Sequence, residues 1–317
     1  MTQGHARSSA AVGLRLTVPS VLTQRNQYDT IRPWQRPQPA PAFRETHRVK
    51  RLRLIFQLSI VAAAAFAGVR YALGKSLVSV ETYCPFGGLE TAWSFFTRRR
   101  FSCAAGETNL ALFIALIVLT LLARKAFCGW VCPAGALFEW EAKLARRVFR
   151  RRDFSGVWPV PAKVDRALKI GLRIGALGLV LVATWKTGEL VFRGYDPYYI
   201  VFSAHGHDVK AWSYLVLAAL LALGLVMPMA WCKYLCPLGA ALWPASIAGR
   251  LRLARNEHHC TNCGACDRNC PQDLPISRVG ELTSGECTLC LECTAACPTP
   301  KALELRWSGV PRPKGRR

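Results

Sequence analysis

Four long apolar stretches divide the 317-residue chain. They run over Leu54–Leu73, Leu110–Ala123, Ala167–Trp185 and Ala211–Cys232. A helix that spans a lipid bilayer needs about 20 mainly apolar residues. We therefore predict four transmembrane helices, at about 54–73, 108–127, 167–186 and 211–231. The second stretch is short and the third begins with charged residues, so a buried core helix is the alternative for these two.

The positions of Lys and Arg predict the orientation of these helices. They number ten in residues 1–53, eleven in 124–169 and twelve in 233–317, against four in 74–109 and three in 186–210. Because positively charged loops stay in the cytoplasm, both termini are predicted to lie on the cytoplasmic side of a bacterial inner membrane. Membrane topology and attraction to anionic lipid then explain the net charge of +23, and no nucleic-acid partner is expected.

The segments around the apolar stretches predict the domain organisation. Residues 1–49 are rich in Arg, Pro, Gln and Ser and lack apolar periodicity, which is typical of a disordered basic cytosolic arm. We predict a membrane domain over 50–250, a cytosolic domain over 251–307 and a basic tail over 308–317. The predicted fold is therefore mostly α, a four-helix transmembrane bundle followed by a C-terminal cytosolic domain.

One cysteine pattern occurs twice in the C-terminal segment. The first copy is Cys260-x2-Cys263-x2-Cys266-x3-Cys270-Pro, and the second is Cys287-x2-Cys290-x2-Cys293-x3-Cys297-Pro. This spacing is typical of bacterial ferredoxins with two [4Fe–4S] clusters, in which the fourth cysteine of each run ligates the other run's cluster. It predicts one ligand set of Cys260, Cys263, Cys266 and Cys297 and a second set of Cys287, Cys290, Cys293 and Cys270. Zinc is the alternative for Cys-x2-Cys pairs, and a disulfide framework is the alternative outside the cytosol.

Two further cysteine pairs follow the second and fourth apolar stretches. Both have the form Cys-x3-Cys-Pro, with Cys128 and Cys132 in segment 128–140 and Cys232 and Cys236 in segment 232–248. A parallel internal duplication of this kind predicts that the two pairs face each other at the cytosolic interface. The four thiols could hold a further metal or cluster or act as redox-active dithiols. Alternatively, the motif is a helix break in which the cysteines serve as small apolar residues.

A third, incomplete copy of this motif lies in the first predicted outer loop. Cys84-Pro85 matches the second half of the motif, but Val80 stands where the first cysteine would be. Cys103 is the only other cysteine of that loop. The two could close a disulfide in an oxidising compartment or ligate a cofactor near the outer surface, and the sequence leaves this open.

These motifs together resemble one family. Tyr83-Cys84-Pro85-Phe86-Gly87-Gly88, the two Cys-x3-Cys-Pro pairs and the terminal eight-cysteine run are similar to polytopic membrane ferredoxins of the NapH type and to the membrane core of NosR-type proteins. The resemblance covers roughly residues 50–305. It implies a four-span core, two cytosolic [4Fe–4S] clusters and electron exchange with the quinone pool or a partner flavoprotein. By similarity, the eight cysteines of the run are the cluster ligands.

The expected function is therefore membrane-bound electron transfer, and no catalytic residue is predicted. The chain would pass single electrons between the quinone pool or a membrane partner and two cytosolic clusters, as a subunit of a respiratory or maturation system. Two other classes stay open. One is a redox-sensing regulator or assembly scaffold with structural clusters, and the other is an oxidoreductase that itself turns over quinol.

Overall fold

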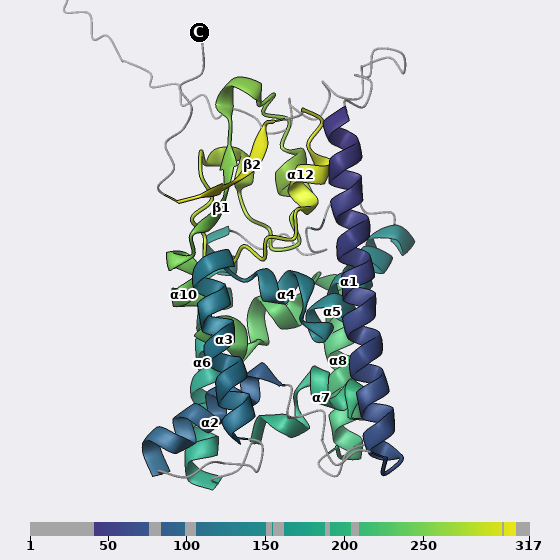
Figure 1. Ribbon diagram of the computed structural model, residues 1–317, viewed down its shortest axis with the longest axis vertical. Helices are drawn as coiled ribbons and strands as arrows, with labels where there is room; N and C mark the ends of the chain where they lie inside the picture. Colours follow the sequence, from purple (N-terminus) through teal and green to yellow (C-terminus); the bar gives the residue numbers. More distant parts are fainter. Residues whose placement is uncertain are drawn as a thin grey trace, which may run out of the picture. The chain divides into compact units, whose positions relative to one another are not determined.

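The computed structural model describes residues 41–75, 84–98, 106–149, 154, 162–187, 191–203, 209–299 and 301–308. These residues are mostly helical, which confirms the predicted class (Figure 1). Four long helices cover the four apolar stretches: α1 (Pro41–Ala72), α3 (Gly106–Ala123), α6 (Ala162–Thr187) and α8 (Ala211–Val226). The sequence predicts a disordered arm over 1–49. In the structure α1 begins at Pro41, so residues 41–49 are helical instead. Residues 1–40 of that arm and residues 309–317 of the tail lie outside the described residues.

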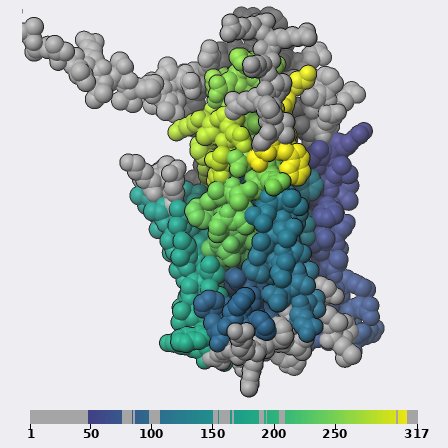
Figure 2. Space-filling model, turned by 60° about the vertical axis from the view of Figure 1, so that its left-hand side comes forward, coloured from purple at the N-terminus to yellow at the C-terminus, as the bar shows by residue number. Residues whose placement is uncertain are grey.

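Two of these helices are long and apolar enough to cross a membrane. They are the parts of α1 and α6 that cover Arg48–Ala72 and Ala167–Thr187, and only 17% of each apolar window is buried. The core helix of a soluble protein would bury such side chains, yet Phe66 is 65% exposed and Leu179 is 72% exposed. Figure 2 shows α6, α3 and α1 at the surface along much of their length. This exposure indicates surfaces that face lipid.

The second and fourth predicted spans are shorter in the structure than in the prediction. Helix α3 ends at Ala123, before Arg124 with a φ of 54°, and α8 ends at Val226, before Pro228. A left-handed residue and a proline both stop a helix whatever the hydrophobicity around them. The chain continues in short α4 (Ala126–Trp130) and in the π-helical segment η5 (Trp231–Leu235). A four-span topology therefore stays a prediction.

Shorter helices fill the space among the long ones. They are α2 (Pro85–Arg98), α5 (Pro133–Val148), η4 (Val191–Gly194), α7 (Pro197–Phe202), α9 (Pro237–Ala241) and α10 (Trp243–Ala248). The long helices make their principal contacts with these: α3 with α2, α6 with η5 and α9, α8 with α5, and α1 with α5. The buried core includes Phe86, Phe113, Phe138, Val180, Leu220 and Trp231. The long helices thus surround an inner layer of short ones.

The eight-cysteine run lies between two paired strands. β1 (Leu251–Arg255) and β2 (Leu303–Trp307) are antiparallel, with Leu251 opposite Trp307 and Arg255 opposite Leu303. Four short helical segments lie between them: η6 (Glu257–His259), α11 (Ala265–Arg268), η7 (Ile276–Arg278) and α12 (Glu292–Ala296). A separate apolar core of Leu253, Leu274, Ile276 and Leu282 packs against Cys266, Cys270 and Cys293. The strand pairing brings the beginning and end of the run together.

Candidate metal centres

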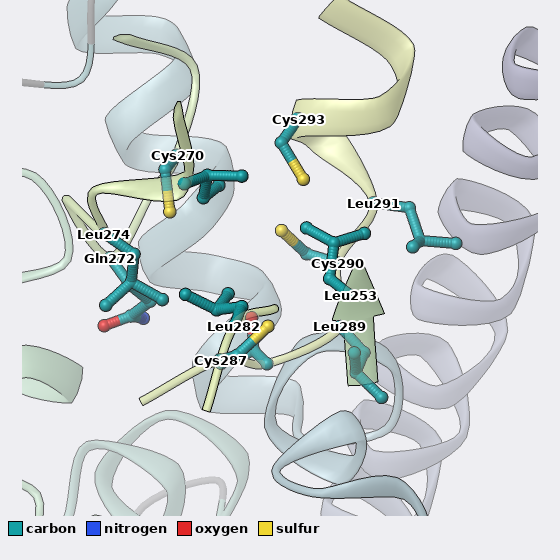
Figure 3. A pocket seen from close by; sticks show the side chains of 12 residues that line it. Leu253, Cys270, Gln272, Leu274, Leu282, Cys287, Leu289, Cys290, Leu291 and Cys293 are labelled. Atoms are coloured by element: carbon teal, nitrogen blue, oxygen red, sulfur yellow. The ribbon is translucent and has the colours of Figure 1, made fainter. Parts of the chain in front are cut away.

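Four cysteines line one cavity in the C-terminal segment. They are Cys270, Cys287, Cys290 and Cys293, and the rest of the lining is mainly leucine and isoleucine. Figure 3 shows the four sulfur atoms facing the shared space. Cys270 belongs to the first run of the pattern and the other three to the second. The structure therefore brings together the second set that the spacing predicts.

The other four cysteines of the run lie near one another. The Cys297 thiol interacts electrostatically with Cys260 and Cys263, and the Cys266 thiol interacts with Cys297. The pairing of β1 with β2 explains this, because the strands fix the chain just before Cys260 and shortly after Cys297. Cysteines of both runs therefore lie near Cys297, and their grouping into one ligand set stays a prediction.

The two runs share an unusual backbone conformation. Positive φ angles occur at Asn262 (53°) and Gly264 (66°) in the first run and at the corresponding Leu289 (48°) and Leu291 (58°) in the second. Left-handed leucines are strained, so the surrounding structure must impose this conformation. Successive backbone N–H groups in such turns point into one concavity that favours negative charge. The repeated conformation therefore forms a cradle for an anionic group in each run.

The sulfur atoms accept hydrogen bonds from this backbone. The N–H of Leu289 donates to Cys287, and the N–H of Glu292 donates to Cys290. Burial, together with the neighbouring Cys290 thiol, raises the pKa of Cys270 to about 12, and burial raises that of Cys290 to about 11. A bound metal reverses this tendency, because its positive charge stabilises the thiolate. The convergent thiols and N–H donors fit a [4Fe–4S] cluster. The described residues contain no group of three His, Cys, Asp or Glu side chains placed to hold a single metal ion.

Arg53 of α1 connects the membrane helices to the second cysteine set. Its side chain is 3% exposed and forms ion pairs with Glu139 of α5 and Glu292 of α12. It also donates to the carbonyl of Gly129 at 2.9 Å and to the carbonyl of Cys290 at 3.0 Å. One buried guanidinium thus joins two membrane-domain helices to the loop that carries Cys290.

Further cations, on α6, in η5 and just after α3, contact the same cysteine-bearing segment. Arg173 of α6 donates to Glu286 at 2.6 Å, and Lys125 lies 3.3 Å from the same carboxylate. Arg124 donates to the carbonyl of Ser284 at 2.6 Å, and Lys233 pairs with Asp273 at 2.5 Å. These cations therefore bind acidic and carbonyl groups in the segment between Cys270 and Cys287.

The first Cys-x3-Cys-Pro motif lies directly against the second cysteine set. A Cβ atom on Gly129 would stand 2.7 Å from the carbonyl oxygen of Thr288, so only glycine allows this approach. The neighbouring Trp130 donates from its indole nitrogen to the carbonyl of Leu289 at 3.0 Å. The residues between Cys128 and Cys132 thus pack directly against the Cys287–Cys290 loop.

The two Cys-x3-Cys-Pro pairs come together as the duplication predicts. Cys128 lies within electrostatic range of Cys236, and Cys232 lies within range of Cys128 and Cys132. Cys132 caps α5, with its sulfur accepting a hydrogen bond from the N–H of Gly135 at 3.4 Å. Whether the four thiols bind a metal or serve as capping residues stays a prediction.

Cys84 is half-buried and packs on the same apolar core as Cys232 and Cys236. Its sulfur donates to Asp196 at 3.7 Å, and Asp196 in turn accepts a hydrogen bond from the N–H of Tyr198 at the start of α7. Cys103 lies outside the described residues, so a pair between Cys84 and Cys103 stays a prediction.

Sequence reasoning missed Asp196 and Arg53. Asp196-Pro197 begins a short helix in the same way as Cys84-Pro85, Cys132-Pro133 and Cys236-Pro237 do, so the X-Pro pattern could have revealed it as a fourth copy. Arg53 stands immediately before the first apolar stretch, where a basic residue is ordinary. No signal in the sequence distinguishes it from a lipid-facing arginine.

The comparisons with known proteins agree with the cysteine patterns. The family described as "4Fe-4S binding domain" matches residues 106–152 and 210–250, which contain both Cys-x3-Cys-Pro motifs. MJ0750 of Methanocaldococcus jannaschii is 34% identical over 59% of this chain and 75% of its own length. The chain belongs to the family of NapH- and NosR-type 4Fe–4S ferredoxin-type proteins.

Other members of this family are similar over most of the chain. YccM of Escherichia coli is 29% identical over 71% of this chain and 62% of its own length. The ferredoxin-type protein NapH of Haemophilus influenzae is 30% identical over 58% of this chain and 63% of its own length. The chain thus spans less than two thirds of the length of YccM and NapH. No solved structure matches it.

Proposed function

We propose that this chain is the membrane-anchored electron-transfer subunit of a respiratory or maturation redox system in a bacterial inner membrane. It carries single electrons between the quinone pool, or a membrane partner, and two [4Fe–4S] clusters on the cytoplasmic side. The observation that carries this proposal is the cavity lined by Cys270, Cys287, Cys290 and Cys293, which lies against membrane-domain residues. When bound, the clusters would supply one-electron redox chemistry.

The contacts of the two cysteine sets support different roles for them. The set with Cys290 contacts Arg53, and its loop rests on Gly129 and Trp130. In the loop of the set with Cys260, Asn262 is exposed. We therefore assign the set with Cys290 to electron exchange with the membrane side. The set with Cys260 is assigned to exchange with a soluble partner. Arg255, whose guanidinium lies 3.6 Å from the Cys260 sulfur, pairs with Glu257 and donates to Asn262, and so fixes this loop.

Arg53 and Trp130 position the loop of the set with Cys290. Cys293 is buried and Cys290 is half-buried, and the mainly apolar cavity lining leaves backbone N–H groups as polar contacts of the sulfurs. An apolar, fixed environment lowers the reorganisation that accompanies a change of charge. Arg53 contributes a positive charge close to Cys290, which favours the more negative, reduced state.

The ligand assignment is tested by comparing three single variants purified without oxygen. If Cys270 serves the set of the second run, Cys270→Ala and Cys290→Ala lose the same electron paramagnetic resonance signal, whereas Cys263→Ala loses the other. Iron and acid-labile sulfide should fall by about half in each case, because one of two clusters is lost. Wild-type protein without iron or sulfide would refute the proposal. A signal in Cys270→Ala that resembles Cys263→Ala would refute the exchange of ligands between runs.

Electron flux is tested with the protein in lipid vesicles and a reduced quinone analogue. Rapid bleaching of the cluster absorbance supports transfer from the membrane. A relative in the comparisons carries the name "Regulatory protein NosR", so a redox-sensing regulator or assembly scaffold is the second candidate. Clusters that are present but accept no electrons from quinol or from a membrane partner would favour that candidate.

A further inference from the structure

A groove of about 470 Å³ opens between α1 and α5, next to α12. Six basic residues line it: Lys50, Arg51, Arg53, Lys143, Arg146 and Arg147. One carboxylate, Glu292, also lines the groove, and Glu139 pairs with Arg53 at its inner end. Six cations thus share two carboxylates, and the groove has a strong excess of positive charge.

The inner cations of the groove are neutralised and the outer ones are not. Lys50 and Lys143 bind Glu292 at 2.8 and 2.9 Å, and Arg53 binds both carboxylates. Arg51 and Arg147 are exposed, and no ion pair joins either of them to another of the described residues. Among the described residues, the charge without a carboxylate partner therefore stands at the mouth of the groove, where it can contact a ligand.

Apart from Gln57, the rest of the groove is apolar. Leu54 and Leu144 line it beside the basic residues, and Trp140 donates from its indole nitrogen to Gln57 at 3.2 Å. Tryptophan with its N–H bonded and its ring against apolar side chains is typical of a membrane interface. A free phosphate would use only the basic residues. An amphiphile with an anionic head and apolar tails would use both parts.

We propose that this groove binds the headgroup of an anionic phospholipid. The groove lies at the beginning of the candidate span Arg48–Ala72, where a lipid headgroup layer would meet the protein. The proposal rests on the membrane insertion of α1 and not on electron transfer. Because Glu292 lies between Cys290 and Cys293, a bound lipid would also stand next to the set with Cys290.

The test is lipid retention by the full chain in nanodiscs made from equal parts of phosphatidylglycerol and phosphatidylcholine. The protein is released into detergent, and the lipids that stay bound are identified by native mass spectrometry. The test variant is Arg51→Gln/Arg147→Gln, which removes only exposed side chains. The control is Arg278→Gln/Lys301→Gln, which removes the same charge from exposed positions outside the groove.

We expect wild type and control to retain phosphatidylglycerol in preference to phosphatidylcholine. Each basic residue near an anionic headgroup contributes about 1 kcal/mol, so the test variant should bind it roughly thirtyfold more weakly. Equal retention of both lipids by wild type, or an unchanged test variant, would overturn the proposal. Displacement of the lipid by millimolar inorganic phosphate would identify the groove as a soluble-anion site and also overturn it. Iron content and reduction by quinol are measured on the same samples, so failure here leaves the proposed function untouched.

Discussion

Replacement of Arg53 by methionine should separate the cysteine-bearing domain from the membrane helices. Methionine keeps much of the length and volume of the side chain and removes its charge and donors. The guanidinium pairs with Glu139 and Glu292 and donates to the carbonyls of Gly129 and Cys290. All of these contacts join different segments of the chain, so the variant weakens an interface rather than one helix.

The expected loss is about 3 kcal/mol of unfolding free energy. Removing one partner of a buried ion pair costs about 3–5 kcal/mol, because the other charge stays buried without compensation. The lower end applies here, since Lys143 still pairs with Glu139 and Glu292, and Gln57 still donates to the Gly129 carbonyl. The carbonyl of Cys290 loses the side-chain donor that the structure gives it. A loss of this size changes the unfolding equilibrium more than a hundredfold.

The measurement is denaturant-induced unfolding in detergent micelles, followed by tryptophan fluorescence. Trp130 and Trp140, two of the ten tryptophans, lie at this contact and contribute to the signal. The control is Arg70→Met on the same helix. Arg70 is exposed, and among the described residues it donates only to the Lys75 carbonyl, so its replacement should change the unfolding free energy by less than about 0.5 kcal/mol.

The reasoning would be refuted by a loss below about 1 kcal/mol, or by equal losses in Arg53→Met and Arg70→Met. Either result would mean that Arg53 behaves as an ordinary surface cation. The double variant Arg53→Met/Glu292→Gln gives a second check. If the two side chains interact as the structure shows, its loss is smaller than the sum of the two single losses.

Three further predictions concern the same interface. Gly129→Ala should lower the unfolding free energy by about 1–3 kcal/mol and alter the signal of one cluster, because its Cβ would stand 2.7 Å from the Thr288 carbonyl oxygen. The control Gly175→Ala adds a Cβ with no heavy atom within 4 Å, so calorimetry should find it neutral or stabilising. Trp130→Phe removes the donor to Leu289 and should cost about 1–3 kcal/mol in the same denaturant titration, and no change would show that water replaces the indole. Arg173→Met should release the domain to limited proteolysis, and a cleavage pattern like that of wild type would contradict its role.

Much of the candidate site could be predicted from the sequence because its geometry is local. Three cysteines at intervals of three residues fold around one group whatever surrounds them, and the Cys-Pro that ends each run marks the fourth ligand. The same is true of the apolar stretches, since hydrophobicity determines which segments face lipid. The helix ends were predicted less well. Arg124 and Met229 have left-handed backbones inside regions that hydrophobicity alone assigns to spans.

The sequence by itself determined the eight-cysteine pattern, the four apolar stretches and the family of this protein. The tertiary structure decided which parts of the chain meet. Nothing in the spacing of Gly129 and Thr288 indicates that they touch, because 159 residues separate them. The role of Arg53 likewise follows only from its ion pairs with Glu139 and Glu292, which the tertiary structure shows. The physical reason is that residue type fixes what a side chain can bind, whereas packing fixes which partner is within its reach.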